Sequence, residues 1–346
     1  MEGDTVRKDF REIDTEKKLL ITGSAGFIGF HLAKELLELG CKVVGYDNLN
    51  DYYDVGLKQS RLETLKGYDG FRFIQGDLTD AGMLSEVFLE YEPQIVVNLA
   101  AQAGVRYSIQ NPAAYMESNM IGFFNILEEC RKSYAQGRIP VEHLVFASSS
   151  SVYGNQKKVP FSVEDKVDEP ISFYAATKKS NELMTHAYSQ IYGIPATGLR
   201  FFTVYGPYGR PDMAYFSFTR KILAGEPIQV FNQGNLYRDF TYIDDIVAGI
   251  KNVLNNPPVP NMSATRFKVY NIGNHQPVNL LYFIEVLEDK LGVKAEKEFL
   301  PMQPGDVYQT YAEVGDLTKD FDFKPDTPIE VGLERFAAWY KAYYRI

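Results

Sequence analysis

The N-terminal part of the chain places a short apolar strand, a glycine-rich turn and a helix in direct succession. The strand covers residues 18–22, glycines stand at positions 23, 26 and 29, and a helical run covers residues 31–39. Such a turn lets the backbone approach a pyrophosphate, whose charge then lies at the helix N-terminus. The spacing G-x-x-G-x-x-G departs from the usual G-x-G-x-x-G, and a glycine triplet alone is more often only a turn. The order of the three elements therefore carries the prediction of a dinucleotide site.

A second strand, residues 42–46, ends at Asp47. An acid at this distance can bind the 2′-hydroxyl of an adenine ribose and would repel a 2′-phosphate. No Lys or Arg follows before Lys58, so the sequence favours NAD over NADP.

Strands and helices continue to alternate up to residue 201. Further strands are expected at 71–75, 94–99, 143–147 and 196–201, and helices at 55–65, up to about 91, 113–131 and 174–192. Regular alternation predicts an α/β fold with a doubly wound parallel Rossmann sheet. Right-handed crossovers place all carboxyl ends of the strands at one edge, where ligands bind. We expect the cofactor contacts there, at Gly23, Gly26, Phe27, Ile28, Gly29, Asp47, Asp77, Leu78, Ala100 and Lys178.

After about Gly206 the pattern loosens, and prolines and glycines become frequent. Shorter helices are expected near 213–224, 244–254, 279–291 and 329–343. We therefore expect three regions. Residues 1–17 form a charged, frayed extension, and residues 18–205 form the NAD-binding Rossmann domain, which also receives later segments near 237–272. Residues 206–346 form mainly a smaller, mixed substrate-binding subdomain.

Two segments of the chain carry groups suited to acid–base chemistry. Ser148–Gly154 contains a run of hydroxyls, and Tyr174 stands four residues before Lys178, on the same helix face. A free tyrosine titrates near ~10, and a neighbouring ammonium favours the phenolate and lowers that pKa. This arrangement can remove a proton from an alcohol while hydride leaves its carbon, although a Tyr-x-x-x-Lys pair alone is weak evidence.

Composition narrows the function classes. The formal net charge of -9 argues against nucleic-acid binding, and the four histidines do not cluster, so no metal site is expected. Cys41 and Cys130 are expected to be buried thiols in a reducing compartment. The charged N-terminus does not resemble a signal peptide or an anchor, and no segment reaches the ~20 apolar residues of a membrane span. We therefore expect a cytoplasmic protein without a membrane partner.

Several motifs together resemble the nucleotide-sugar epimerases among the extended short-chain dehydrogenase/reductases, and most of all the UDP-glucuronate 4-epimerases. The similarity extends from Lys18 to the end of the chain. Its specific parts are Thr22–Gly29, Leu99–Ser108, Ser148–Gly154, Tyr174–Lys178, Arg200–Pro207, Gly209–Met213 and Arg238–Ile243.

The resemblance implies a mechanism. Tyr174 takes the proton from the 4′-hydroxyl of a UDP-sugar while hydride passes to NAD, and Ser149 supplies the hydroxyl beside the tyrosine. Lys178 lowers the pKa of Tyr174 and binds the nicotinamide ribose. The 4-keto sugar turns and takes the hydride back on its other face, so NAD is regenerated.

Three positions depart from the patterns of relatives. Relatives that dehydrate carry Asp-Glu just before Val-Tyr-Gly, and decarboxylating relatives carry Glu at the second position, whereas this chain has Ser150 and Ser151. These serines argue against lyase chemistry. Gln303 replaces an arginine that many relatives place on the nucleotide phosphates, so Arg238 is expected to do more of that work.

The expected substrate contacts are Arg106, Ser149, Ser150, Ser151, Thr203, Arg210, Arg238 and Asp306. Arg210 lies in a loop that resembles the substrate loop of uronate-specific members, and its guanidinium fork suits a carboxylate. Phe216 and Phe218 are candidates for stacking on uracil. The helices at 113–131 and 174–192 are expected to form a homodimer, as in relatives. A C4 epimerase of neutral or N-acetylated UDP-hexoses, a decarboxylase or dehydratase, and a non-catalytic NAD-binding protein remain the alternatives.

Overall fold

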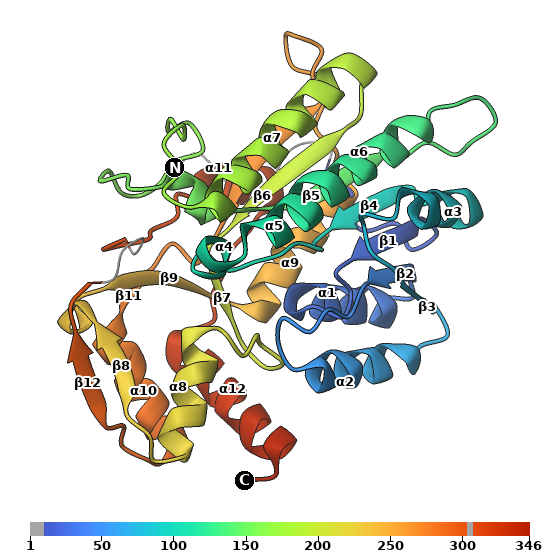
Figure 1. The fold of residues 1–346 in the computed structure, drawn as a ribbon. Helices are drawn as coiled ribbons and strands as arrows, with labels where there is room; N and C mark the ends of the chain where they lie inside the picture. Colours follow the sequence, from blue (N-terminus) through green and yellow to red (C-terminus); the bar gives the residue numbers. More distant parts are fainter. Residues whose placement is uncertain (1–9, 303–306) are drawn as a thin grey trace.

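The computed structural model describes residues 10–302 and 307–346, and a seven-stranded parallel sheet lies at its centre (Figure 1). The strand order is β10-β6-β5-β4-β1-β2-β3, which confirms the doubly wound α/β fold. The strand bounds are β1 Lys18–Thr22, β2 Lys42–Asp47, β3 Phe71–Gln75, β4 Ile95–Asn98, β5 His143–Ser149, β6 Ala196–Phe201 and β10 Phe267–Ile272.

Helices cover both faces of this sheet. On one face α1 packs between α2 and α9, and α11 packs against α9. On the other face α6 packs between α3 and α7. Successive strand residues such as Leu19 and Leu20 enter different hydrophobic clusters, as expected for a sheet buried on both faces. The bounds are α1 Phe27–Glu38, α2 Val55–Lys66, α3 Ala81–Tyr91, α6 Phe123–Lys132, α7 Phe173–Tyr192, α9 Ile243–Leu254 and α11 Gly315–Phe321.

The second half of the chain adds two small sheets. A three-stranded sheet has the order β11-β9-β7, and β12 pairs with β8 in parallel. The expected helices near 213–224, 279–291 and 329–343 are present, whereas the short strands were not predicted. The bounds are β7 Thr203–Tyr205, β8 Ile228–Phe231, β9 Tyr237–Tyr242, β11 Pro277–Asn279, β12 Lys297–Leu300, α8 Ala214–Leu223, α10 Leu280–Leu291 and α12 Ile329–Tyr344.

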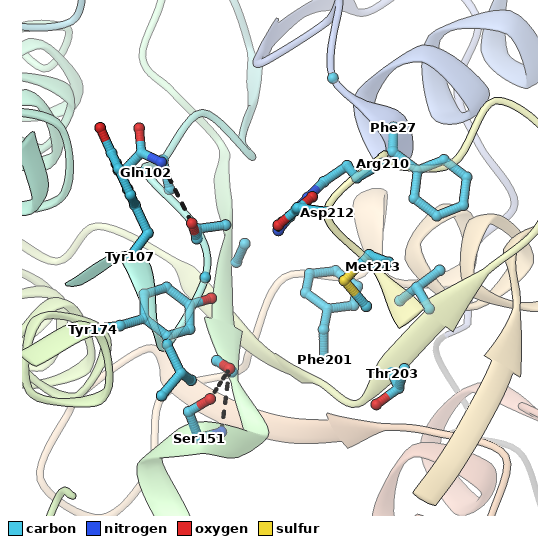
Figure 2. Close-up of a pocket in the computed structure, with 18 of the residues that line it drawn as sticks. Phe27, Gln102, Tyr107, Ser151, Tyr174, Phe201, Thr203, Arg210, Asp212 and Met213 are labelled. Atoms are coloured by element: carbon cyan, nitrogen blue, oxygen red, sulfur yellow. Dashed lines mark hydrogen bonds and ion pairs between the residues drawn. The ribbon is translucent and has the colours of Figure 1, made fainter. Parts of the chain in front are cut away.

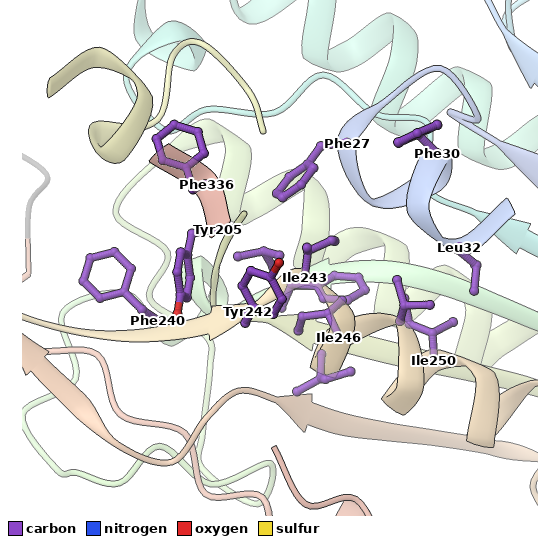
Figure 3. Close-up of a cluster of buried hydrophobic side chains, with 14 of the residues drawn as sticks. Phe27, Phe30, Leu32, Tyr205, Phe240, Tyr242, Ile243, Ile246, Ile250 and Phe336 are labelled. Carbon is purple, nitrogen blue, oxygen red and sulfur yellow. The ribbon is translucent and has the colours of Figure 1, made fainter. Parts of the chain in front are cut away.

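One hydrophobic cluster joins the central sheet to this added part (Figure 3). Phe27 and Phe30 reach it from α1, Ile243 from α9 and Tyr205 from β7. Phe336 of α12 belongs to the same buried cluster. The same buried packing therefore supports both sides of the site that lies between the two parts.

Three segments differ from the sequence expectations. The helix expected at 113–131 is interrupted: a short helix α5, Pro112–Tyr115, leads into a π-helical segment, Met116–Gly122 (η1), before α6. The described part of the N-terminal extension is not frayed, because Arg11 and Asn256 exchange backbone and side-chain hydrogen bonds. Strand β10, which completes the central sheet beside β6, was not predicted as a strand, although later segments near 237–272 were expected to join the Rossmann domain.

Candidate active site

A cavity of about 1000 Å³ lies at the carboxyl edge of the central sheet, between the sheet and the added part. Every residue that the sequence assigned to cofactor or substrate lines this cavity, except Asp306. Asp306 and Gln303 lie outside the described residues. Figure 2 shows part of the wall, where Tyr174, Ser151, Thr203 and Arg210 face a common space.

The glycine turn is shaped for close backbone contacts. Gly23 has a φ of +70°, and a Cβ at this position would lie 2.7 Å from the backbone nitrogen of Ala100. A Cβ at Gly29 would lie 2.1 Å from the carbonyl oxygen of Gly23, so α1 could not begin so near the sheet with any other residue. Gly26 is the N-cap of α1 and also lines the cavity. The turn thus offers a helix N-terminus at the cavity wall, which fits a dinucleotide pyrophosphate.

Asp47 lies at the end of β2 and is nearly buried. Its Oδ2 accepts from the backbone N–H of Ala25 at 3.1 Å, and its Oδ1 accepts from that of Leu49 at 2.9 Å. The carboxylate therefore holds the glycine turn in addition to facing the cavity.

Lys58 also lines the cavity, where its Nζ donates to Oδ1 of Asn50 at 2.8 Å. Burial lowers the pKa of Lys58, and the charge of Asp47 opposes that shift. Lys58 is the first cation after Asp47 in the sequence, and it reaches the same cavity from α2.

Asp77 and Leu78 follow β3 and form another part of the wall. Oδ2 of Asp77 accepts from the side-chain amide of Asn48 at 2.7 Å, and Oδ1 accepts from the backbone N–H and hydroxyl of Thr79. Burial alone would raise the pKa of Asp77, but these hydrogen bonds lower it overall.

Tyr174 and Lys178 lie on one face of α7, near the start of the helix. Nζ of Lys178 lies 6.0 Å from the centroid of the Tyr174 ring and donates to the carbonyl of Ala147 at 2.8 Å. Burial lowers the pKa of Lys178 to about 8. Burial also raises the pKa of Tyr174, while a hydrogen bond with Ser149 and the charge of Arg210 oppose the rise.

The pKa of Tyr174 thus differs from the sequence expectation, which had Lys178 lowering it. The physical reason is that the ammonium is directed at a strand carbonyl, while the phenol lies in a buried environment where its charged form is disfavoured. The positive charge that favours the phenolate comes from Arg210, which the sequence assigned only to the substrate.

The serine run places two hydroxyls beside Tyr174. Oγ of Ser149 accepts from the backbone N–H of Ser151 at 3.2 Å and donates to the Ser151 hydroxyl at 3.1 Å (Figure 2). Ser149 is thereby the N-cap of a short 3₁₀ turn, Ser150–Tyr153. This turn fixes the hydroxyls that can share a proton with the tyrosine.

Arg210 is held by a carboxylate of its own loop. Its Nε and Nη2 bind the two oxygens of Asp212 at 3.0 and 2.5 Å, and Asp212 also accepts from the hydroxyl of Tyr52 at 3.2 Å. Burial alone would raise the pKa of Asp212, but the charge of Arg210 lowers it. The two side chains are 22% and 27% exposed, so both reach the cavity. The sequence analysis missed Asp212 because nothing in the Arg-Pro-Asp sequence shows that the two charges meet.

Aromatic and basic residues line the far end of the cavity. The guanidinium of Arg106 lies 5.3 Å from the ring centroid of Phe231, and Arg238 donates to the carbonyl of Tyr308 at 3.3 Å. Phe218 lines the cavity, but Phe216 packs in the core, so the stacking candidate Phe216 was wrong. Phe231, on β8, was missed because that strand was not predicted.

Asn119 is a further residue that the sequence analysis missed. It lies in the π-helical segment, where its side chain accepts from the backbone N–H of Gln102 at 2.8 Å and donates to the Gln102 carbonyl at 3.0 Å. The side-chain amide also donates to Thr177 on α7, and the Asn119 carbonyl accepts from Asn181. Asn119 thus ties the loop after β4 to the helix of Tyr174, and π segments often mark such sites.

Three further observations on the described residues concern metal binding, membrane spans and the two cysteines. No group of three His, Cys, Asp or Glu side chains in residues 10–302 and 307–346 is placed to hold a metal ion. No helix in the same ranges has the length and apolar character needed to cross a membrane. Cys41 and Cys130 are free buried thiols, and burial raises the pKa of both.

Comparison with known proteins extends these observations. The model of the NAD dependent epimerase/dehydratase family matches residues 19–273. The chain is 52% identical to Protein CapI of Staphylococcus aureus, over 95% of this chain and 99% of that one. It is 47% identical to UDP-glucuronate 4-epimerase 1 of Arabidopsis thaliana, over 94% of this chain and 77% of that one.

Solved structures of UDP-sugar 4-epimerases are also similar to this chain. A UDP-glucuronic acid 4-epimerase from Bacillus cereus, in complex with UDP-glucuronic acid and NAD, aligns with a TM-score of 0.85 and 33% identity. That alignment covers 94% of this chain and 100% of the other. A UDP-glucose 4-epimerase from Thermus thermophilus with NAD gives a TM-score of 0.81 and 27% identity, over 94% of this chain and 99% of that one. The protein therefore belongs to the NAD-dependent epimerase/dehydratase family.

Proposed function

We propose that this protein interconverts UDP-glucuronate and UDP-galacturonate by inverting the sugar at C4, with NAD bound in the cavity. One observation carries the proposal: a single cavity is lined by a glycine turn, by Tyr174 and Ser149, and by the guanidinium of Arg210. The named UDP-glucuronate 4-epimerases among its relatives support the choice of substrate.

The residues that would hold NAD fit that group. The turn at Gly23 and Gly26 would receive the pyrophosphate, Asp47 the adenine ribose, and Lys178 the nicotinamide ribose. NAD, when bound, would accept hydride from the sugar C4 and give it back. In this proposal residues 18–205, with β10, bind mainly the cofactor, and residues 206–346 bind mainly the UDP-sugar.

Tyr174 would take the proton from the sugar 4-hydroxyl and later return it, and the Ser149 hydroxyl, which lines the same cavity, would share that proton. Because burial raises its pKa, the phenol needs nearby positive charge at the moment of transfer. Arg210 supplies such charge, and it also offers the fork that suits a sugar carboxylate. Thr203, across the cavity, is the second proposed contact for that carboxylate (Figure 2).

Ser150 and Ser151 favour an epimerase over a lyase. Both line the cavity beside Tyr174, where dehydrating or decarboxylating relatives would place a carboxylic acid. A serine hydroxyl is too weak an acid to protonate an enol or a leaving hydroxyl. The 4-keto sugar would therefore mainly be reduced again by return of the hydride.

A C4 epimerase of neutral UDP-hexoses is the second candidate, because Asp212 already neutralises Arg210. One experiment separates these functions. The protein is incubated with UDP-glucuronate and, separately, with UDP-glucose, and products are followed by proton NMR. We expect UDP-galacturonate from the first substrate. A UDP-pentose would indicate decarboxylation, and conversion of UDP-glucose alone would select the neutral-sugar epimerase.

We also propose a homodimer in the cytoplasm. Apolar side chains stand exposed on the neighbouring helices α6 and α7 and at their ends; they are Ile121, Phe124, Leu183, Ile191 and Tyr192. Leu183 is 60% exposed and Ile191 is 68% exposed, which suits a surface covered by a second copy. The two buried free thiols fit a reducing compartment.

A further inference from the structure

Arg61, on α2, is a buried guanidinium that the proposed chemistry does not use. Its side chain is 0% exposed, and among residues 10–302 and 307–346 no carboxylate lies within 4.0 Å of it. Burying a charge without a counter-ion is costly unless hydrogen bonds compensate. The acceptors that Arg61 uses therefore show what the chain gains from it.

The three carbonyl acceptors of Arg61 belong to two separate loops, and its fourth acceptor is the hydroxyl of Tyr53, just before α2. Nη1 donates to the carbonyl of Ala25 at 2.7 Å and to the Tyr53 hydroxyl at 2.7 Å. Nη2 donates to the carbonyls of Tyr208 and Gly209 at 2.6 and 3.3 Å. Ala25 lies inside the glycine turn, and Tyr208 and Gly209 directly precede Arg210. One guanidinium thus joins the cofactor loop to the loop of the proposed carboxylate ligand.

The glycine turn is held from both sides at Ala25. Its N–H donates to Asp47 at 3.1 Å, while its carbonyl accepts from Arg61. The setting of this peptide therefore depends on the residue proposed for the adenine ribose and on Arg61 together.

The segment before Arg210 needs such a restraint. Tyr208 has a φ of +55°, a left-handed conformation that is strained for a residue with a Cβ and persists only when its surroundings impose it. Its ring packs on Phe30 and Trp339, at centroid distances of 4.9 and 5.0 Å, while Arg61 holds its carbonyl. His31 fixes the preceding carbonyl, of Pro207, at 2.9 Å.

We propose that Arg61 is a positioning residue that sets the direction of Arg210 and couples it to the glycine turn. This inference rests on the proposed function, because it assigns Arg61 to recognition of the sugar carboxylate. Without Arg61, Tyr208 can relax toward an ordinary conformation, and the guanidinium that follows two residues later no longer faces the sugar. In this proposal neither Arg61 nor Arg210 takes part in binding the nucleotide part of the substrate.

The test compares binding of UDP-glucuronate and UDP to the NAD-loaded protein by isothermal titration calorimetry. Arg61→Met keeps the length of the side chain and removes its donors. We expect the Kd for UDP-glucuronate to rise on the order of tenfold, as for a lost charge-assisted contact, and the Kd for UDP to change less than about twofold. Equal weakening of both ligands would overturn the inference, because it would show a general packing role.

Two further variants guard against simple destabilisation. Leu65→Ala removes another fully buried side chain of α2 and should lower Tm without changing the ratio of the two Kd values. Arg61→Lys keeps a cation but loses the planar fork, so it should show an intermediate ratio. A folded Arg61→Lys protein with the wild-type ratio would contradict the proposal, and it remains measurable if Arg61→Met does not fold.

A double-mutant cycle shows whether Arg61 acts through Arg210. In an Arg210→Ala protein, adding Arg61→Met or Arg61→Lys should change the Kd for UDP-glucuronate less than about twofold. Full additivity would mean that Arg61 acts by another route. A wild-type protein that binds UDP-glucuronate no better than UDP-glucose would instead overturn the proposed uronate function, whatever the Arg61 variants do.

Discussion

Replacing Arg210 by alanine should do more than remove a ligand for the sugar carboxylate, because it leaves Asp212 behind. In the structure the guanidinium binds both oxygens of Asp212. An Arg210→Ala protein would lack the cation that lowers the pKa of Asp212. It would present the Asp212 carboxylate to a substrate that carries a carboxylate of its own. The expected loss therefore has two parts, a missing attraction and a new repulsion.

The two parts have comparable size. A lost charge-assisted contact costs about 1.5–3 kcal/mol. Two like charges at roughly 6–8 Å in an effective dielectric of about 20 repel by on the order of 2–3 kcal/mol, and partial exposure of Asp212 screens this to about half or a little more. The sum is about 3–5 kcal/mol, which raises the Kd for UDP-glucuronate between a hundredfold and several thousandfold.

Calorimetry on three variants separates the parts. Arg210→Ala should show the full loss, and adding Asp212→Asn should recover roughly the repulsive part, about tenfold in Kd. Asp212→Asn alone should bind UDP-glucuronate at least as well as wild type, since Arg210 is no longer shared. Binding of UDP should stay nearly constant throughout. If Arg210→Ala binds UDP-glucuronate as tightly as wild type, the carboxylate is held elsewhere.

The Arg210→Ala protein should also release a decarboxylated product. Oxidation of glucuronate at C4 creates a β-keto acid, which loses CO₂ when the breaking bond lies perpendicular to the carbonyl plane. Arg210 is proposed to hold the carboxylate away from that orientation. Each released keto sugar leaves its hydride on the cofactor as NADH. Proton NMR of Arg210→Ala with UDP-glucuronate and excess NAD should therefore show UDP-4-keto-pentose, and its absence during turnover would show that the orientation is controlled by other groups.

Four further results are expected. Tyr174→Phe should retain NAD but lower turnover by roughly 10²–10⁴, measured by NMR, and near-normal turnover would exclude its role as base. Asp47→Ala should weaken NAD and admit NADP, because Lys58 remains at the cavity wall to meet a 2′-phosphate; unchanged selectivity in fluorescence titrations would contradict this. In NAD-free protein the pKa of Lys178 is about 8, against 10.5 in the unfolded chain, so between pH 8 and 10.5 the unfolded chain holds a proton that the folded protein has released. Denaturant titrations should therefore show the free energy of unfolding rising with pH in this range, and Lys178→Met should lack that contribution. Light scattering at micromolar concentration should give a dimer mass, and Leu183→Glu should give a monomer.

The sequence predicted those parts of the fold that depend on local pattern. The strands of the central sheet up to residue 201 were found from apolar runs, with ends correct to about two residues. Their crossover helices were also found, but α1 begins at Phe27 and not at residue 31, and the helix expected at 113–131 is interrupted. The π-helical segment at 116–122 was not predicted; within it, Asn119 bonds to Gln102 and accepts from Asn181. A helix-period pattern cannot reveal hydrogen bonds to other segments.

The short strands of the added part were missed for a related reason. Strands β7 and β11 have three residues each and acquire their partners only when β9 lies between them. Their residues carry no alternating pattern long enough to detect. The sequence also did not show which aromatic residues enter the core. Phe216 packs there against Phe336 of α12, which lies more than a hundred residues later in the chain.

Within the site, residue types were easier to predict than their electrostatics. The wall residues followed from motifs, and all of those in the described ranges reach the cavity. The effect of Lys178 on Tyr174 did not follow, because spacing on a helix fixes the face of a side chain but not the carbonyl that its end selects. Burial, which raises the pKa of Tyr174, is a property of the whole fold.

The late arrival of β10 in the central sheet has a consequence for how the protein is made. Strand β6 ends at Phe201 and its outer partner begins only at Phe267. At ~5–20 residues per second, a ribosome needs about 3–13 s to synthesise the intervening segment. Throughout that interval a newly formed sheet would present β6 as an open edge, to which other nascent chains could add a strand. Slowing translation between these two strands should therefore increase aggregation of this protein, whereas slowing it after Ile272 should not.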